Sequence, residues 1–255
     1  MDLKLKGKRA LVTGGSRGIG REIVRALLAE GCTVATCARG ADGLAAIEAE
    51  ASAMGGEVHG ATLDVRDRLA FEAWFAVAVE QLGGLDIVVS NVSTRVTITG
   101  EEMWRETFET DLLQHVRLAE LAVPALLKGE SPALVFISSI AGVLTNLPPG
   151  EEAYGTMKAA LVNYAGQLSA RFGGKGLRVN TVSPGPIYFK GGVWDQIRTH
   201  QPALFESAAR LSVLGRHGTA REVGDAVAFL ASPLAGYITG ANLRVDGGMV
   251  KTANF

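Results

Sequence analysis

A tyrosine and a lysine stand four residues apart in the segment Tyr154-Gly155-Thr156-Met157-Lys158. On a helix, residues at this spacing share one face, one turn apart. A free phenol loses its proton only near pH ~10, and a neighbouring ammonium group favours the phenolate. Such a pair can protonate an alkoxide, or deprotonate an alcohol in reverse. The same spacing also occurs on ordinary amphipathic helices.

Two serines, Ser138 and Ser139, follow the apolar run Leu134–Ile137, which is typical of a strand buried on both faces. In an open parallel sheet, ligands bind at the carboxyl ends of the strands. A serine hydroxyl at that edge can donate a hydrogen bond to a developing oxyanion. The serines and the Tyr–Lys pair therefore belong to one candidate site for carbonyl or alcohol chemistry.

A glycine-rich turn, TGGSRGIG at 13–20, joins an apolar run to an amphipathic helix. Gly14 permits a tight turn, Gly18 permits close approach of a pyrophosphate, and Gly20 permits close packing of the helix. The helix N-terminus offers free N–H groups to phosphates. A plain glycine turn is the alternative. The residues expected to bind a dinucleotide here are Gly14, Ser16, Arg17, Gly18, Ile19 and Gly20.

The next apolar run ends at Ala38, where dinucleotide sites often carry an acid for the ribose 2′-hydroxyl. Arg39 follows, and an arginine suits a 2′-phosphate. Together with Arg17 it favours NADP(H) over NAD, unless it is a solvated surface residue. Asp64 and Val65 are expected to meet the adenine through a carboxylate and a backbone amide, or to cap a strand end.

Short apolar runs alternate with helix-sized segments, which predicts an α/β chain with a parallel sheet. Helices are expected at 69–81 and at 101–127, the second bent or interrupted by Pro124. We expect one domain over 1–255, with a substrate-loop insertion around 186–215. The expected strands are Ala10–Val12, Thr33–Cys37, Ala61–Val65, Asp86–Val89, Leu134–Ile137, Arg178–Val182 and Leu243–Val245.

The composition excludes several classes of protein. The 255 residues carry a net charge of −1, without the basic excess of a nucleic-acid binder. There is no apolar stretch of the ~18 residues needed to cross a bilayer, and no secretory h-region. The two cysteines, Cys32 and Cys37, are expected to be buried free thiols. The histidines lack metal-like spacing, so we expect no metal site. Free thiols, with no secretory or membrane segment, lead us to expect a cytoplasmic protein.

The sequence resembles the short-chain dehydrogenases/reductases over essentially its whole length. No single motif establishes the resemblance, but the order and spacing of seven motifs together do. The motifs are TGGSRGIG (13–20), LDV (63–65), DIVVSNVS (86–93), ISSIAG (137–142), YGTMK (154–158), VNTVSPGPI (179–187) and ITGANLRVDGG (238–248).

The resemblance implies a single Rossmann-like doubly wound domain, with about seven parallel strands and helices on both faces. It implies Tyr154 as the acid/base, Lys158 at the nicotinamide ribose, and Ser139 rather than Ser138 at the substrate oxygen. Further cofactor contacts are implied for Asn91, Pro184, Gly185 and Ile187. A homo-oligomer is implied, often a tetramer, with helices near 104–127 and 154–172 and the C-terminal segment at its interfaces.

Three positions depart from the family pattern. Ser93 replaces a glycine. Asp111 stands where the family carries a catalytic asparagine, so we include it among the catalytic candidates. It either pairs with His115, one turn later, in tuning or proton relay, or serves helix packing or a subunit interface. Phe189 replaces a threonine that bonds the cofactor.

Apolar residues follow both the catalytic serine and the Pro184-Gly185 turn. They favour a hydrophobic ketone or β-ketoacyl substrate over a sugar, unless they only pack the loop onto the body. The expected substrate-contacting residues are Ser139, Val143, Leu144, Tyr188, Phe189 and Trp194.

We therefore expect NADPH-dependent reduction of a small-molecule carbonyl to an alcohol. The alternatives are an alcohol dehydrogenase that works mainly by oxidation, and a catalytically silent NADP-binding sensor or scaffold. An intact set of Ser139, Tyr154 and Lys158 argues against the silent protein.

Overall fold

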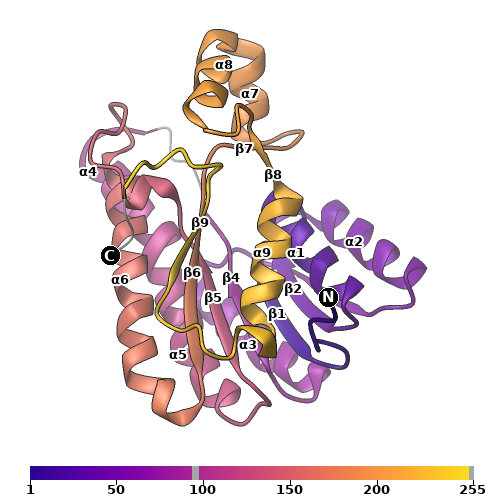
Figure 1. The fold of residues 1–255 in the computed structure, drawn as a ribbon. Helices are drawn as coiled ribbons and strands as arrows, with labels where there is room; N and C mark the ends of the chain where they lie inside the picture. Colours follow the sequence, from indigo (N-terminus) through magenta and orange to yellow (C-terminus); the bar gives the residue numbers. More distant parts are fainter. Residues whose placement is uncertain (94–97, 253–255) are drawn as a thin grey trace.

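The computed structural model describes residues 1–93 and 98–252. Within them, seven parallel strands form one sheet in the order β3–β2–β1–β4–β5–β6–β9 (Figure 1). The strands are β1 (Arg9–Thr13), β2 (Thr33–Ala38), β3 (Val58–Thr62), β4 (Ile87–Ser90), β5 (Ala133–Ile137), β6 (Arg178–Pro184) and β9 (Asn242–Val245). A separate short pair consists of β7 (Ile187–Tyr188) and β8 (Gly218–Thr219). The expected parallel sheet is confirmed.

Helices alternate with these strands along the chain. The α-helices are α1 (Gly18–Ala29), α2 (Ala41–Ala53), α3 (Arg68–Leu82), α4 (Gly100–Phe108), α5 (Gln114–Leu126), α6 (Glu152–Phe172), α7 (Val193–His200), α8 (Pro202–Leu211) and α9 (Ala220–Ala231). A π-helical segment, η1 (Glu109–Leu113), joins α4 to α5. Three 3₁₀ turns are η2 (Ile140–Gly142), η3 (Gly173–Lys175) and η4 (Pro233–Ala235).

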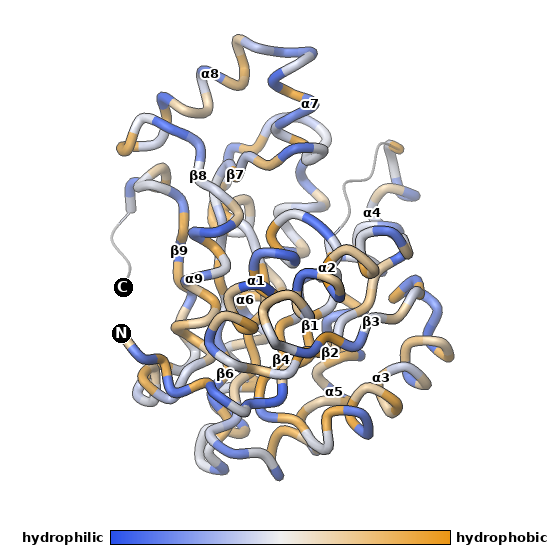
Figure 2. Tube along the Cα trace, turned by 90° about the vertical axis from the view of Figure 1, so that its right-hand side faces the viewer, coloured by the Kyte–Doolittle hydropathy of each residue, from blue (hydrophilic) through white to orange (hydrophobic). Residues whose placement is uncertain are grey.

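Alternate residues of each strand serve two separate cores, because successive strand side chains point to opposite faces. Ala10 and Val12 of β1 pack with α1, α2 and α9 on one face. Leu11, between them, packs with α3, α5 and α6 on the other. In Figure 2 the hydrophobic stretches gather along the strands and the helix sides that meet them. The helices thus cover both faces, as a doubly wound sheet requires.

The third strand was expected at Ala61–Val65, but β3 runs from Val58 to Thr62. Pairing with β2 sets its bounds, since Val34 aligns with Val58 and Ala38 with Thr62. Every residue of this edge strand is at least partly exposed, and few of its residues are apolar. The apolar run predicted as a strand therefore extends into the following loop, where Val65 is buried in the core.

The single long helix expected over 101–127 is divided into α4, η1 and α5. Pro124 does not cause the division, because it lies within the last turn of α5. The carbonyl of Glu120, which loses its helical hydrogen bond to Pro124, belongs to an exposed residue and can be hydrated. The division occurs instead at the wider turn of η1.

The insertion expected around 186–215 contains β7, α7 and α8, and its two helices project beyond the sheet (Figure 1). Cys32 and Cys37 are buried free thiols, as expected. Burial raises the pKa of each thiol to about 12. Among the helices of the described residues, none is long and apolar enough to span a membrane. The end of the C-terminal segment, residues 253–255, lies outside the described residues.

Candidate active site

The strand order reverses between β1 and β4, and the ends of these two strands are hydrogen-bonded to each other. The backbone N–H of Asn91 donates to the Thr13 hydroxyl at 3.0 Å. The Asn91 side-chain amide donates to the Thr13 carbonyl, also at 3.0 Å. Asn91 thereby holds the start of the glycine loop at the point where doubly wound sheets bind ligands. The supporting role of Thr13 was not predicted.

The glycine loop has the bare backbone that a dinucleotide site needs. Gly14 has a φ of +76°, in the region that favours glycine. A Cβ atom on Gly20 would lie 2.1 Å from the Gly14 carbonyl oxygen, so no side chain fits there. Arg17 precedes α1 without a side-chain cap on the helix, which leaves the first N–H groups for a ligand. These features fit a pyrophosphate at the start of α1.

Phe189 lies against this loop. A Cβ atom on Gly18 would lie 2.5 Å from the Phe189 Cζ atom, so the ring touches the bare backbone at position 18. The same ring packs against Gly192, at the start of the segment that leads into α7. Phe189 therefore connects the glycine loop with the α7–α8 insertion, which agrees with the alternative that it packs the loop.

The two arginines expected to favour NADP(H) lie beside the ends of β1 and β2. Both are exposed, and neither forms an ion pair with another described residue. Asp64 is engaged by Arg66, with 2.7 Å between Arg66 Nη2 and Asp64 Oδ2. This hydrogen bond outweighs partial burial and lowers the pKa of Asp64. Arg66, two residues beyond Asp64, was not predicted.

The two serines at the end of β5 have different partners. The Ser138 hydroxyl is buried and donates to the backbone carbonyl of Lys158 at 2.9 Å. The partly exposed Ser139 hydroxyl accepts a hydrogen bond of 3.1 Å from the backbone N–H of Ala141. Ser138 therefore anchors α6, and Ser139 is the serine that remains accessible to a substrate.

Tyr154 and Lys158 lie on the same face of α6. The ammonium nitrogen of Lys158 is 5.6 Å from the centre of the Tyr154 ring. Lys158 is 1% exposed, while Tyr154 is partly exposed. This arrangement puts a buried cation beside a phenol that solvent or a ligand can reach.

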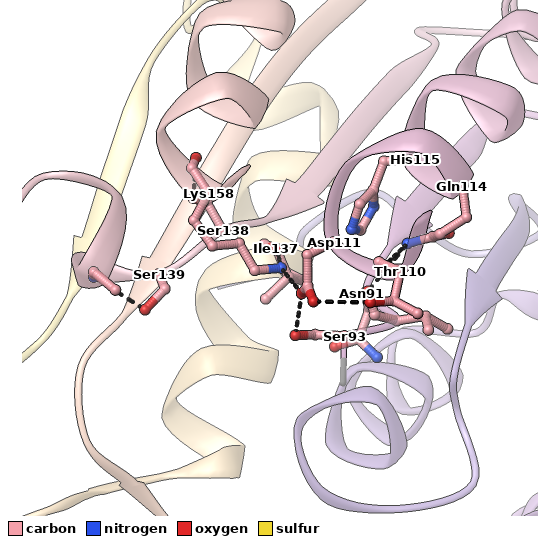
Figure 3. Close-up of polar contacts among 12 residues, drawn as sticks. Asn91, Ser93, Thr110, Asp111, Gln114, His115, Ile137, Ser138, Ser139 and Lys158 are labelled. Atoms are coloured by element: carbon pink, nitrogen blue, oxygen red, sulfur yellow. Dashed lines mark hydrogen bonds and ion pairs between the residues drawn. The ribbon is translucent and has the colours of Figure 1, made fainter. Parts of the chain in front are cut away.

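Asp111 is fully buried in η1, and its Oδ1 atom lies 3.1 Å from Lys158 Nζ (Figure 3). The Ser93 hydroxyl donates to the same oxygen. Lys158 also donates to the Ile137 carbonyl at 3.3 Å. Of the two alternatives for Asp111, the pairing with His115 is wrong, since His115 Nδ1 instead lies 2.6 Å from the Ser90 hydroxyl.

The expected substrate-contacting aromatics mostly pack within the α7–α8 insertion. The Tyr188 hydroxyl donates to Asp195 at 3.0 Å. Trp194 lies beside His217, with 5.0 Å between ring centres, and Phe205 stacks on His217 at 3.9 Å. Two apolar residues that follow Ser139 are more accessible, Val143 being exposed and Leu144 partly exposed.

The segment expected at the nicotinamide runs from Pro184, which ends β6, to Ile187 in β7. A Cβ atom on Gly185 would lie 2.9 Å from the Asp246 Cα atom, so a bare backbone is needed at this turn. Ile187 is 5% exposed and packs into the core rather than outward.

Known dehydrogenases and reductases are similar to this chain over nearly its whole length. A family model described as enoyl-(acyl carrier protein) reductase matches residues 14–250. Isoepoxydon dehydrogenase patN of Aspergillus clavatus is 36% identical over 249 residues, covering 96% of this chain and 95% of that protein. The chain belongs to the short-chain dehydrogenases/reductases.

Two further relatives support the assignment. 3-Oxoacyl-[acyl-carrier-protein] reductase FabG of Escherichia coli is 34% identical over 256 aligned residues, covering 97% of this chain and 99% of that protein. The structure of a short-chain dehydrogenase/reductase from Serratia marcescens superimposes with a TM-score of 0.86 at 30% identity, covering 96% and 98% of the two chains. As a short-chain dehydrogenase/reductase, the protein is an oxidoreductase of a nicotinamide-dependent family.

Proposed function

We propose that the protein reduces a ketone or β-ketoacyl carbonyl to an alcohol with NADPH, and that Tyr154 supplies the proton. The observation that carries this proposal is the buried ammonium of Lys158, 5.6 Å from the centre of the Tyr154 ring. A cation at this distance favours the phenolate that proton donation leaves behind. The similarity to FabG, a 3-oxoacyl-[acyl-carrier-protein] reductase, supports the same substrate class.

Each polar side chain has one task in this proposal. The Ser139 hydroxyl donates a hydrogen bond to the substrate oxygen and so orients the carbonyl. Tyr154 passes its proton to that oxygen, and Lys158 stabilises the resulting phenolate. Asp111 is a positioning residue, because it holds the Lys158 ammonium. The nicotinamide dinucleotide, when bound, supplies the hydride.

The glycine loop and the start of α1 would hold the cofactor phosphates, while Asn91, Pro184, Gly185 and the backbone of Ile187, whose side chain packs into the core, would border the nicotinamide half. Arg17 and Arg39 are exposed and form no ion pair with another described residue, which supports NADP(H) rather than NAD, since each can form charge-assisted hydrogen bonds with a 2′-phosphate. Asp64 and Val65 would lie at the adenine.

Exposed apolar residues support an apolar substrate and a homo-oligomer. Val143 is 39% exposed directly after the serine turn. On α4, Trp104 and Phe108 are 39% and 40% exposed, and burial of large aromatics between subunits would be favourable. We infer that this surface joins copies of the chain in a tetramer.

The test is a carbonyl panel with NADPH, followed by loss of nicotinamide absorbance, using apolar ketones and β-ketoacyl thioesters. Tyr154→Phe is expected to lower kcat at least ~100-fold, because general acid catalysis contributes about 10²–10⁴-fold. Tyr164→Phe, on the same helix, is the matched control and should retain activity. Ketone turnover that survives Tyr154→Phe largely intact would reject the assignment.

A second candidate is oxidation of a secondary alcohol by the same residues in reverse. The similarity to patN, an isoepoxydon dehydrogenase, favours this direction. Measuring both directions across pH with one alcohol–ketone pair distinguishes the two. A silent sensor or scaffold would bind NADPH and turn over no member of the panel.

A further inference from the structure

Asp111 is surrounded by hydrogen-bond donors at the base of the site. Its Oδ1 atom receives the Lys158 ammonium at 3.1 Å and the Ser93 hydroxyl. Its Oδ2 atom receives the Thr110 hydroxyl at 3.2 Å. In Figure 3 the carboxylate lies between Lys158 and Ser93, which come from different parts of the chain. Two of the departures from the family pattern, Ser93 and Asp111, are therefore hydrogen-bonded to each other in one network.

Among the described residues, the elements that pack around Lys158 contribute few charges. Segment η1 contributes Asp111, α5 contributes His115, and α6 itself contributes Tyr154. Strand β5 contributes the backbone carbonyl of Ile137. Burial, with the nearby Lys158 charge, lowers the pKa of His115 well below its usual value, so this imidazole is neutral. Within the described part of the chain, Asp111 is therefore the group that balances the ammonium charge.

The opposite charges of Asp111 and Lys158 together determine the electrostatic environment of the Tyr154 phenol. A lone ammonium near Tyr154 would favour its phenolate, but a carboxylate 3.1 Å from that ammonium offsets the attraction. Little solvent screening intervenes, because Asp111 and Lys158 are 0% and 1% exposed. The net positive charge beside Tyr154 is therefore smaller than that of the lysine alone.

We propose that Ser93 and Asp111 form a positioning pair that holds a carboxylate against Lys158 and keeps Tyr154 in its proton-donating form. The pair thereby favours carbonyl reduction at neutral pH, and moves alcohol oxidation, which needs the phenolate, to higher pH. This inference rests on the proposed function, because it assigns Tyr154 the proton-transfer step.

The first experiment needs neither cofactor nor substrate. The chain has four tyrosines, so subtracting the alkaline absorbance titration of Tyr154→Phe isolates the tyrosinate signal of Tyr154. Asp111→Asn removes the charge, while its amide can still accept from Ser93 and Lys158 and donate to Thr110. We expect it to move the Tyr154 titration to lower pH by about one unit, a tenfold change in ionisation.

The matched control is Glu109→Gln, which removes a carboxylate from the same segment. Glu109 pairs with Arg117 at 3.2 Å rather than with Lys158, so the Tyr154 titration should not move. Ser93→Ala tests the pairing: it should shift the titration when Asp111 is present, and have little effect in the Asp111→Asn background. Thermal unfolding of each variant verifies that the fold is retained.

The second readout is the pH profile of kcat/KM for alcohol oxidation, which should move with the absorbance titration in Asp111→Asn. An unmoved or higher Tyr154 titration in that variant overturns the inference, even if Tyr154→Phe is inactive and the proposed function stands. Conversely, an inactive carbonyl panel with a downward titration shift rejects the proposed function and supports the charge pairing.

Discussion

The Ser138 hydroxyl donates a hydrogen bond of 2.9 Å to the backbone carbonyl of Lys158, which ties the end of β5 to the second turn of α6. Its neighbour Ser139 instead accepts from the backbone of η2 and remains partly exposed. Adjacent serines thus carry different tasks: one holds the helix that carries Tyr154 and Lys158, and the other faces the ligand side.

Substitution of these two serines should affect different properties, stability for Ser138 and activity for Ser139. We expect Ser138→Ala to lower the free energy of unfolding by about 1 kcal/mol, because a buried hydrogen bond is lost. We expect Ser139→Ala to lower kcat by about 10²-fold with little change in stability, as for loss of an oxyanion donor. Urea unfolding and steady-state kinetics on both variants give the answer. The opposite pattern would transfer the catalytic role to Ser138.

Cofactor preference should depend on the exposed Arg39. We expect Arg39→Ala to raise the Kd of NADPH by about tenfold or more and to leave that of NADH nearly unchanged, because only NADPH carries the 2′-phosphate. Fluorescence titration with both cofactors measures this. Arg171→Ala, which removes an exposed cation from α6, is the control. An unchanged NADPH preference would mean that Arg39 does not bind the 2′-phosphate.

The contact of Phe189 with Gly18 should weaken cofactor binding. The ring touches the glycine whose bare backbone a pyrophosphate approaches, so the ring must move when the dinucleotide enters. We expect Phe189→Thr to lower the Kd of NADPH several-fold, because the small hydroxyl side chain leaves room at the loop and adds a hydrogen-bonding group. Calorimetric titration measures the effect.

Tyr237→Thr is the control for that change, since Tyr237 is fully exposed. Equal or weaker NADPH binding in Phe189→Thr would show that the ring packs on the bound cofactor rather than competing with it.

The sequence predicted best what local backbone geometry determines. The bare glycine loop is an example, because Gly14 and Gly20 are required by contacts within one turn. The order of strands and helices was also predicted, since buried parallel strands have a clear apolar pattern. The bounds of β3 were not, because an edge strand is defined by its pairing with β2 rather than by its own residues.

The partner of Asp111 could not be predicted. Residues four apart share a face only on a regular α-helix. Asp111 lies in η1, whose wider π-helical turn changes the phase relative to His115 in α5. The carboxylate therefore points to Lys158, which is distant in sequence, and only the folded arrangement reveals the pair.

Asp86 is a buried carboxylate that supports the sheet beneath the site. It accepts hydrogen bonds from the Arg9 backbone N–H at 3.0 Å, from Arg9 Nε at 2.9 Å and from the Glu130 backbone N–H at 2.8 Å. Burial raises its pKa, but the hydrogen bonds from Arg9 and Glu130 outweigh burial, so the pKa is lowered overall.

We expect Asp86→Asn to reduce the free energy of unfolding by about 2–3 kcal/mol at neutral pH, because Arg9 and the Glu130 backbone lose a charged acceptor. Since the pKa is lower in the folded state, the stabilisation is complete above the unfolded pKa of about 4 and is lost as pH falls through the folded value. Urea unfolding from neutral pH to below pH ~4 should therefore show the difference between the parent and Asp86→Asn narrowing. Asp225→Asn, which removes an exposed i,i+4 partner of Arg221, should cost less than ~0.5 kcal/mol. A difference that stays constant across this pH range would mean that the Asp86 charge contributes nothing to stability.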